Sequence, residues 1–297
     1  MKNLLMLLAL IGMTLAPSFS YAAKSKNEVK STTSKKVDKK SNKETEQIRK
    51  EITQDAITAI NETVNALRHL DKKKTKSALR SLEKATGKLD IILARDPSLA
   101  LAPVDVVAQT YDTITTPKHV ERLRDDAEDF LEDGRVQEAR RILENLRSET
   151  VISTTNIPLA TYPQAIKKAV ALIDKKKIDE AKVVLQVALN TLVITDTIIP
   201  LPVARAKAFL EDAEKLAENK KRSSDQNKEL KQLLDLAGEE IELAKAFGYG
   251  TKDELKKFKK ELEEIREKTE DGKSGFGFFK KIKESMKSIT KSSQDKK

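Results

Sequence analysis

Three segments of the chain share one spacing of small and branched apolar residues, and this repeat constrains the fold more than any other feature of the sequence. The copies are Ala66/Leu70/Ala78/Leu82/Ile91/Pro97, Ala127/Leu131/Ala139/Leu143/Ile152/Pro158 and Ala169/Ile173/Ala181/Leu185/Ile194/Pro200. No copy contains a gap, so a composition rich in Lys and Ala does not by itself explain the matches. A repeated packing unit predicts a scaffold or a binding surface more readily than an active site.

Each copy has a polar break between its two Ala positions. The breaks are Asp71-Lys72-Lys73-Lys74, Glu132-Asp133-Gly134-Arg135 and Asp174-Lys175-Lys176-Lys177. Two amphipathic stretches around such a break predict an antiparallel helical hairpin, in which Ala lets the helices approach closely and Leu fills the seam. We therefore expect an all-α fold of repeated antiparallel helical hairpins packed as a bundle.

The second and third hairpins are each followed by a β-branched run, at 150–155 and 192–197. Such runs disfavour helix and predict short extended segments between the hairpins, while the periodicity leaves their pairing open. Proline ends each unit, and Thr116-Pro117 has the pattern of an N-cap followed by the first helical residue. Residues 98–116 form an insert between the first and second copies.

The N-terminus predicts export. Lys2 precedes an apolar run over residues 4–15, and Ser20-Tyr21-Ala22 supplies the small residues that a signal peptidase needs, so residues 1–22 are interpreted as a secretory signal peptide. The chain has no cysteine, which excludes a disulfide framework and a lipid-modified cysteine after the signal. We expect a periplasmic protein that is not a lipoprotein.

Charge and composition divide the rest of the chain. Residues 23–43 are mostly Lys, Ser and Thr, and are interpreted as a disordered basic linker. Residues 44–218 are assigned to the helical repeat domain, 219–272 to a C-terminal helical extension and 273–297 to a basic amphipathic tail. Ten Lys and Arg oppose four acids over 24–50 and eight Lys oppose two acids over 273–297, so the net charge of +10 comes from the two ends. Basic ends on a mildly acidic body do not predict nucleic-acid binding.

No group of residues predicts a reaction. His69 aligns with apolar residues in the other copies and is assigned to the seam, and His119 has no second ligand at a useful spacing. The acidic residues Asp125, Asp126, Glu128, Asp129, Glu132 and Asp133 lack the spacing of an EF-hand loop and are interpreted as a solvated face. The sequence shows neither a Gly-rich phosphate loop nor a nucleophile elbow. We therefore assign no catalytic, cofactor or metal site and expect a protein that is not an enzyme.

The tail contains the one candidate contact site. Its apolar stripe consists of Phe278, Phe279, Ile282, Met286 and Ile289, and the surrounding basic residues are Lys280, Lys281, Lys283 and Lys287. A cationic amphipathic helix of this kind lies on an anionic membrane surface or docks on protein, either its own helices or another subunit, and both alternatives stay open.

Several strings in the repeat region resemble the YfdX family of exported bacterial proteins. They are Lys84-Ala85-Thr86-Gly87-Lys88-Leu89-Asp90, Leu93-Ala94-Arg95-Asp96-Pro97, Ser153-Thr154-Thr155-Asn156-Ile157-Pro158-Leu159-Ala160-Thr161-Tyr162-Pro163, Leu189-Asn190-Thr191-Leu192 and Ile199-Pro200-Leu201-Pro202. The resemblance covers approximately residues 51–216. It implies a mostly helical periplasmic protein associated with acid or drug stress and proposed to be chaperone-like, without an established catalytic set.

The leading hypothesis is a non-enzymatic periplasmic helical protein that is stress-associated and chaperone-like, with protein clients. The alternatives are a helical-repeat scaffold that binds one specific envelope partner and a protein held at the membrane surface by its C-terminal helix. A homo-oligomer is compatible with all three hypotheses.

Overall fold

The protein is mostly helical, with one small antiparallel sheet. The computed structural model describes residues 25–294, so the predicted signal peptide lies outside the described residues. The elements are α1 (Lys26–Lys50), α2 (Gln54–Asp71), α3 (Thr75–Arg95), β1 (Leu101–Tyr111), α4 (Pro117–Glu132), α5 (Val136–Asn145), β2 (Glu149–Pro158), α6 (Tyr162–Asp174), α7 (Ile178–Asn190), β3 (Val193–Pro200), α8 (Leu201–Glu218), α9 (Ser224–Phe247), α10 (Lys252–Thr269), a 3-10 turn (Glu270–Gly272) and α11 (Lys280–Gln294). The prediction of a mostly helical fold is confirmed, but the prediction that the fold is all-α is wrong, because three segments form a sheet.

Each copy of the repeat forms a helical hairpin, in which α2 packs on α3, α4 on α5 and α6 on α7. The hinge has the same left-handed backbone in all three copies, with φ of 56° at Lys73, 72° at Gly134 and 61° at Lys176. The next residue donates its N–H to a carbonyl in the last turn of the first helix. These bonds are Lys74 to His69 at 2.8 Å, Arg135 to Phe130 at 2.7 Å and Lys177 to Leu172 at 2.9 Å. The shared geometry is a helix C-terminal motif that satisfies carbonyls at the end of each first helix.

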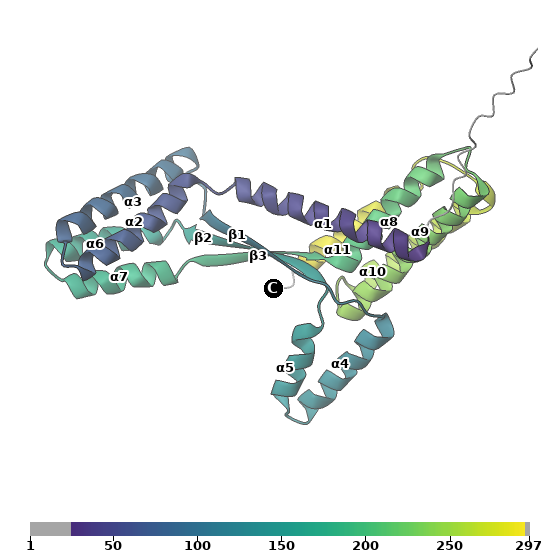
Figure 1. Ribbon diagram of the computed structural model, residues 1–297, viewed down its shortest axis with the longest axis horizontal. Coiled ribbons are helices and arrows are strands. Elements are labelled where there is room, and N and C mark those ends of the chain that lie inside the picture. The colour runs from purple at the N-terminus through teal and green to yellow at the C-terminus, as the bar shows by residue number, and fades with distance from the viewer. Residues whose placement is uncertain (1–24, 295–297) are drawn as a thin grey trace, which may run out of the picture.

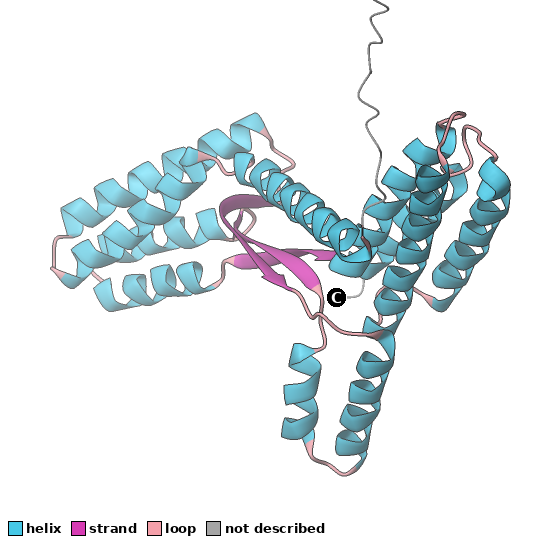
Figure 2. Cartoon of the chain, turned by 45° about the vertical axis from the view of Figure 1, so that its right-hand side comes forward, coloured by secondary structure: helices cyan, strands magenta, loops and turns pink. Residues whose placement is uncertain are grey.

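The three hairpins do not form one bundle. α2 packs on α7 and α3 on α6, so the first and third hairpins bury a common core, whereas α4–α5 stands apart as an arm (Figures 1 and 2). The base of this arm touches α9 through Val120, Leu243 and Ala246. The single bundle that we predicted is therefore wrong, because β1 and β2 flank the middle hairpin and carry it about 30 Å along the sheet.

The β-branched runs are strands, and their pairing, left open by the sequence, is antiparallel in the order β1-β2-β3. Leu101 lies opposite Pro158 and Tyr111 opposite Glu149, while Glu149 also faces Pro200 on the other side. The insert over residues 98–116 contains β1. In the first copy Ile91 lies within α3, so the helix continues where the other two copies turn to strand.

The prediction of a disordered linker over residues 23–43 is wrong for the described residues, because 26–43 belong to α1. Ser25 and Glu28 form a capping box at its start. The buried residues recur at every fourth position: Val29, Thr33, Val37, Ser41 and Thr45. The buried stripe of α1 thus contains two Val residues and three small hydroxyl residues. Through it, α1 packs along α8 and across β1.

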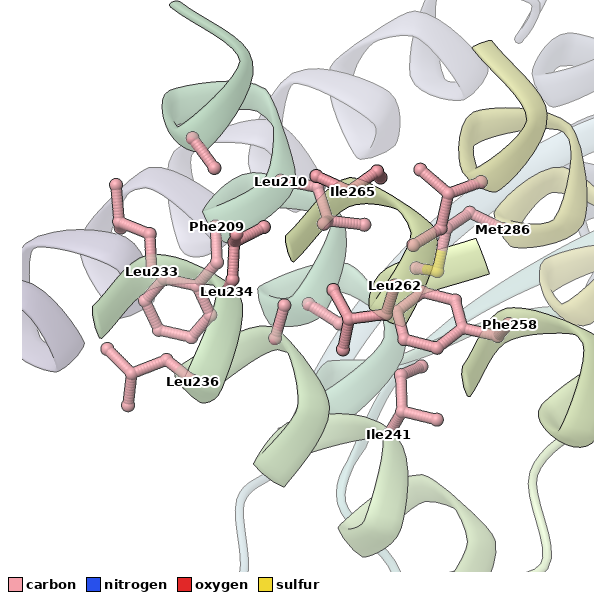
Figure 3. Packing of buried hydrophobic residues seen from close by; sticks show 14 of the residues in the cluster. Phe209, Leu210, Leu233, Leu234, Leu236, Ile241, Phe258, Leu262, Ile265 and Met286 are labelled. Atoms are coloured by element: carbon pink, nitrogen blue, oxygen red, sulfur yellow. The ribbon is translucent and has the colours of Figure 1, made fainter. Parts of the chain in front are cut away.

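The four C-terminal helices share a second core (Figure 3). α8 lies at the end of the predicted repeat domain, and α9 and α10 lie within the predicted C-terminal helical extension. Gly248 ends α9 in the left-handed conformation, and Thr251 forms a capping box with Glu254 at the start of α10. This core contains residues of α8, α10 and α11 together, so it crosses both the boundary predicted at residue 218 and the one predicted at residue 272.

Candidate functional site

The apolar stripe of the predicted tail lies in the C-terminal core. Phe279, Ile282, Met286 and Ile289 are at most 1% exposed and pack with residues of α8, α9 and α10, while Phe278 is half-buried at its edge. The structure therefore has the stripe docked on the protein's own helices. Membrane contact by the stripe would require α11 to leave this core, and it stays a prediction.

The lysines around the stripe lie at the surface of the same helix bundle. Lys280, Lys281 and Lys287 are exposed, and Lys283 is half-buried. Lys281 lies 3.5 Å from the Glu264 carboxylate, and Lys283 pairs with Glu214. On another side of α11, the hydroxyls of Ser288 and Ser292 donate to the carboxylate of Glu254 at 2.5 and 2.7 Å.

The pKa of the Glu254 carboxylate is lowered beside this helix. Burial alone would raise its pKa, but hydrogen bonds from Ser288, Ser292 and the Thr251 backbone N–H outweigh that effect and lower the pKa to about 2. The charged form of Glu254 therefore joins α11 to the start of α10.

The two histidines lie on separate helices. His69 is half-buried on α2, and His119 is exposed in the first turn of α4, where its Nδ1 lies 2.6 Å from a guanidinium nitrogen of Arg122. All six acidic residues of the predicted solvated face are exposed. Among residues 25–294, no three His, Asp or Glu side chains are placed to hold a metal ion.

A partly buried polar network joins the sheet to the C-terminal helices. Arg205 on α8 donates to Asp112 at 2.5 Å, and the other oxygen of Asp112 accepts from the Ser148 hydroxyl at 3.2 Å. Tyr249 accepts from the Ser148 N–H and donates to Glu149 at 2.9 Å. These residues tie the ends of β1 and β2 to α8 and to the loop after α9.

Glu240 is the acid beside this network. Its side chain is buried, and one of its carboxylate oxygens has no hydrogen-bond partner among the described residues. Burial raises the pKa of Glu240 from 4.5 to about 7. The positive charges of Arg205 and Lys30 act to lower this pKa, and the negative charges of Asp112 and Glu239 act to raise it further. No sequence pattern marks this site, because Glu239 and Glu240 have the appearance of two adjacent acidic residues on a solvated helix.

Among residues 25–294, one face of the sheet and the outer edge of β1 beyond Val106 are uncovered. Thr150, Ile152, Thr154 and Asn156 of β2 are buried on the side of α1, and alternation places Val151 on the opposite face. Val107 and Ile194 lie on that opposite face and are 57% and 66% exposed. We call these three residues, together with the outer edge of β1 at Ala108 and Thr110, the open sheet surface.

The backbone of β1 shows which groups point outward. The Val106 carbonyl accepts from Arg49 of α1 at 3.4 Å, and the Val106 N–H donates to the Asp105 carboxylate at 2.9 Å, so both polar groups of Val106 face away from β2. Alternate residues of an antiparallel strand point their N–H and C=O groups to the same side. The backbone groups of Ala108 and Thr110 therefore face outward too, and both residues are exposed. Within residues 25–294, no strand pairs with this edge of β1.

The sequence contained a weak signal for this surface. Val104, Val106 and the β-branched residues after them suggest a strand, but the segment had no counterpart in the repeat and was assigned only as an insert. A free edge cannot be recognised until the strand order is known.

The arm formed by α4 and α5 also leaves apolar side chains uncovered. Leu131, Val136 and Leu143 are 49%, 54% and 47% exposed, and with Arg140 and Glu144 they line a shallow hollow. Within residues 25–294, no helix has both the length and the apolar content needed to cross a bilayer.

Comparison with known proteins agrees with the resemblance found in the sequence. The profile of the YfdX family, described as YfdX protein, matches residues 59–198, inside the region where the resembling strings occur. No curated protein sequence matches the chain. A solved crystal structure of Salmonella Typhi YfdX is 14% identical, with a TM-score of 0.35, and the match covers 50% of this chain and 93% of that one. The region over residues 59–198, a little under half of the chain, therefore belongs to the YfdX family.

Proposed function

We propose that the protein is a non-enzymatic, chaperone-like binder of other polypeptides that is exported to the periplasm and acts there under stress. The open sheet surface is the observation that carries the proposal. An uncovered strand edge offers backbone donors and acceptors to an added strand, and apolar side chains beside it hold the side chains of that strand.

The edge suits clients of varied sequence. Main-chain hydrogen bonds do not depend on the side chains of the added strand, whereas Val107 and Ile194 supply non-directional apolar contact. Arg49 and Asp105 already occupy the polar groups of Val106, so the available stretch begins at Ala108. It is short, which favours weak and reversible binding of many clients.

Suppression of aggregation tests this function directly. The protein is mixed in excess with an acid- or heat-denatured client, and light scattering is followed with time. Ala108→Pro removes the outward N–H without taking a hydrogen bond from the β1–β2 ladder, and Ala108→Val keeps that N–H. We expect suppression by the native protein and by Ala108→Val, and weaker suppression by Ala108→Pro.

Two results would overturn the proposal. Absence of suppression by the native protein at excess rejects the chaperone-like activity. A single stoichiometric complex in a periplasmic pull-down, with no effect on denatured clients, supports a scaffold for one specific envelope partner instead.

A further inference from the structure

The first and third copies of the repeat show how two of these hairpins associate. α2 contacts α7 and α3 contacts α6, so the first helix of each hairpin meets the second helix of the other. This reciprocal contact is the arrangement that a two-fold axis produces between identical units. The side chains in the common core include Leu70, Leu82, Ile173 and Leu185, each at most 5% exposed.

The middle copy has Leu at the equivalent positions, but no hairpin within residues 25–294 covers them. Leu131 is the equivalent of Leu70 and Ile173, and Leu143 is the equivalent of Leu82 and Leu185, yet both are nearly half exposed. Its internal seam is complete, because Ala127 and Ala139 are at most 1% exposed. What the arm lacks is therefore the partner hairpin and not its own packing.

An ion pair between the first and third hairpins also has its counterpart in the arm. Lys182 on α7 lies 2.6 Å from the Asp71 carboxylate at the end of α2. The repeat spacing places Glu132 at the position of Asp71 and Arg140 at the position of Lys182, so acid and base are both retained. Glu132 and Arg140 are exposed, and Arg140 lines the hollow beside Leu131 and Leu143.

The charges of the two halves of the arm favour the same arrangement. The first half, α4 over residues 117–132, carries six acidic side chains against three Lys and Arg. The second half, α5 with Arg135 before it and Arg147 after it, carries four Arg against two acids. Reciprocal packing sets the first half of one arm against the second half of the other and so brings opposite charges together. The arm projects from the rest of the molecule, which leaves its tip accessible to another arm (Figure 2).

We propose that the α4–α5 arm pairs with the same arm of a second copy, in the reciprocal arrangement that the first and third hairpins adopt within one chain. Leu131, Val136 and Leu143 are covered in this dimer, and Glu132 of each subunit pairs with the partner's Arg140. The contact lies away from the open sheet surface, so it is independent of client binding.

The test is the oligomeric state of the protein, measured by sedimentation equilibrium over a range of concentrations. Leu143→Glu is the disrupting variant, because Leu143 is exposed in the monomer and its replacement does not unpack the hairpin. Val187→Glu on α7 is the matched control, since Val187 is 53% exposed outside the arm. We expect a dimer whose Kd rises by about tenfold or more in Leu143→Glu and is unchanged in Val187→Glu, with equal circular dichroism for all three proteins.

A charge exchange tests the geometry. Glu132→Arg sets like charges opposite each other and weakens the dimer, and the double variant Glu132→Arg/Arg140→Glu restores the pair and the dimer. A protein that is monomeric at every concentration, a dimer insensitive to Leu143→Glu, or a double variant that dimerises no better than Glu132→Arg alone would each overturn the proposal.

Discussion

Replacement of Glu240 by Gln should change the way in which stability depends on pH. Glu240 is 7% exposed, and burial raises its pKa from 4.5 to about 7. Because the folded state holds the proton more tightly than the unfolded state, the stabilisation from protonated Glu240 is fully present below pH 4.5 and is lost as the pH rises through about 7. Gln keeps the shape of the neutral acid and cannot ionise.

The difference between 4.5 and about 7 corresponds to about 3 kcal/mol in the free energy of unfolding. We therefore expect the stability of Glu240→Gln relative to the native protein to increase by about 3 kcal/mol between pH 4.5 and pH 8. The groups that face Glu240 are Arg205, Lys30, Asp112 and Glu239, and the substitution leaves all of them in place.

Urea unfolding followed by circular dichroism at several pH values measures this difference. Glu239→Gln is the matched control: burial alone would raise the pKa of Glu239, but Lys26 and Lys30 outweigh that effect and lower it. The stabilisation from ionised Glu239 is present at neutral pH and is lost only in acid. The difference in the free energy of unfolding between Glu239→Gln and the native protein should therefore stay constant between pH 6 and pH 8. A constant difference for Glu240→Gln over the whole range would refute the reasoning.

Three further substitutions test the packing. Ile282→Ala should lower the free energy of unfolding by about 2–5 kcal/mol, because Ile282 is fully buried. Lys280→Ala on the exposed side of α11 should change it by less than about 0.5 kcal/mol. Equal effects of the two substitutions would contradict the docked position of α11. Arg222→Ala removes a guanidinium that donates to four backbone carbonyls around the end of α8. We expect the free energy of unfolding, measured in urea, to fall by about 1–3 kcal/mol. An unchanged free energy of unfolding would show that water replaces these hydrogen bonds. Ala78→Leu should lower the free energy of unfolding by about 1–3 kcal/mol, because the larger side chain separates α2 from α3. Lys76→Leu at an exposed position of α3 should not lower it. An unchanged stability of Ala78→Leu would mean that the seam does not need a small residue.

The repeat predicted the hairpins because the signals for a hairpin are local. Ala at the seam and a polar break lie within one copy, and the break even fixes the same positive φ at Lys73, Gly134 and Lys176. The sequence could not show which hairpins associate, because the three copies have equivalent apolar faces. That choice is made by β1 and β2, which place the middle hairpin at the other end of the sheet.

α1 and the tail show a second limit of the sequence. The buried stripe of α1 contains Thr33, Ser41 and Thr45, which composition counts as polar and which pack because their side chains are small. In the tail, the periodicity correctly marked Phe279, Ile282, Met286 and Ile289 as one face, but periodicity cannot identify the surface that covers a face. Both outcomes depend on contacts between segments far apart in the chain.

Crosslinking in living cells tests the central claim, that the open sheet surface receives other polypeptides. A photoreactive amino acid is placed at Gln109, which is exposed on β1, and in a second strain at Lys175, which is exposed at the hinge after α6; the adducts are identified by mass spectrometry. The account predicts many different envelope proteins attached at position 109, more of them after acid stress, and few at position 175. The same sparse set of adducts from both positions would contradict it.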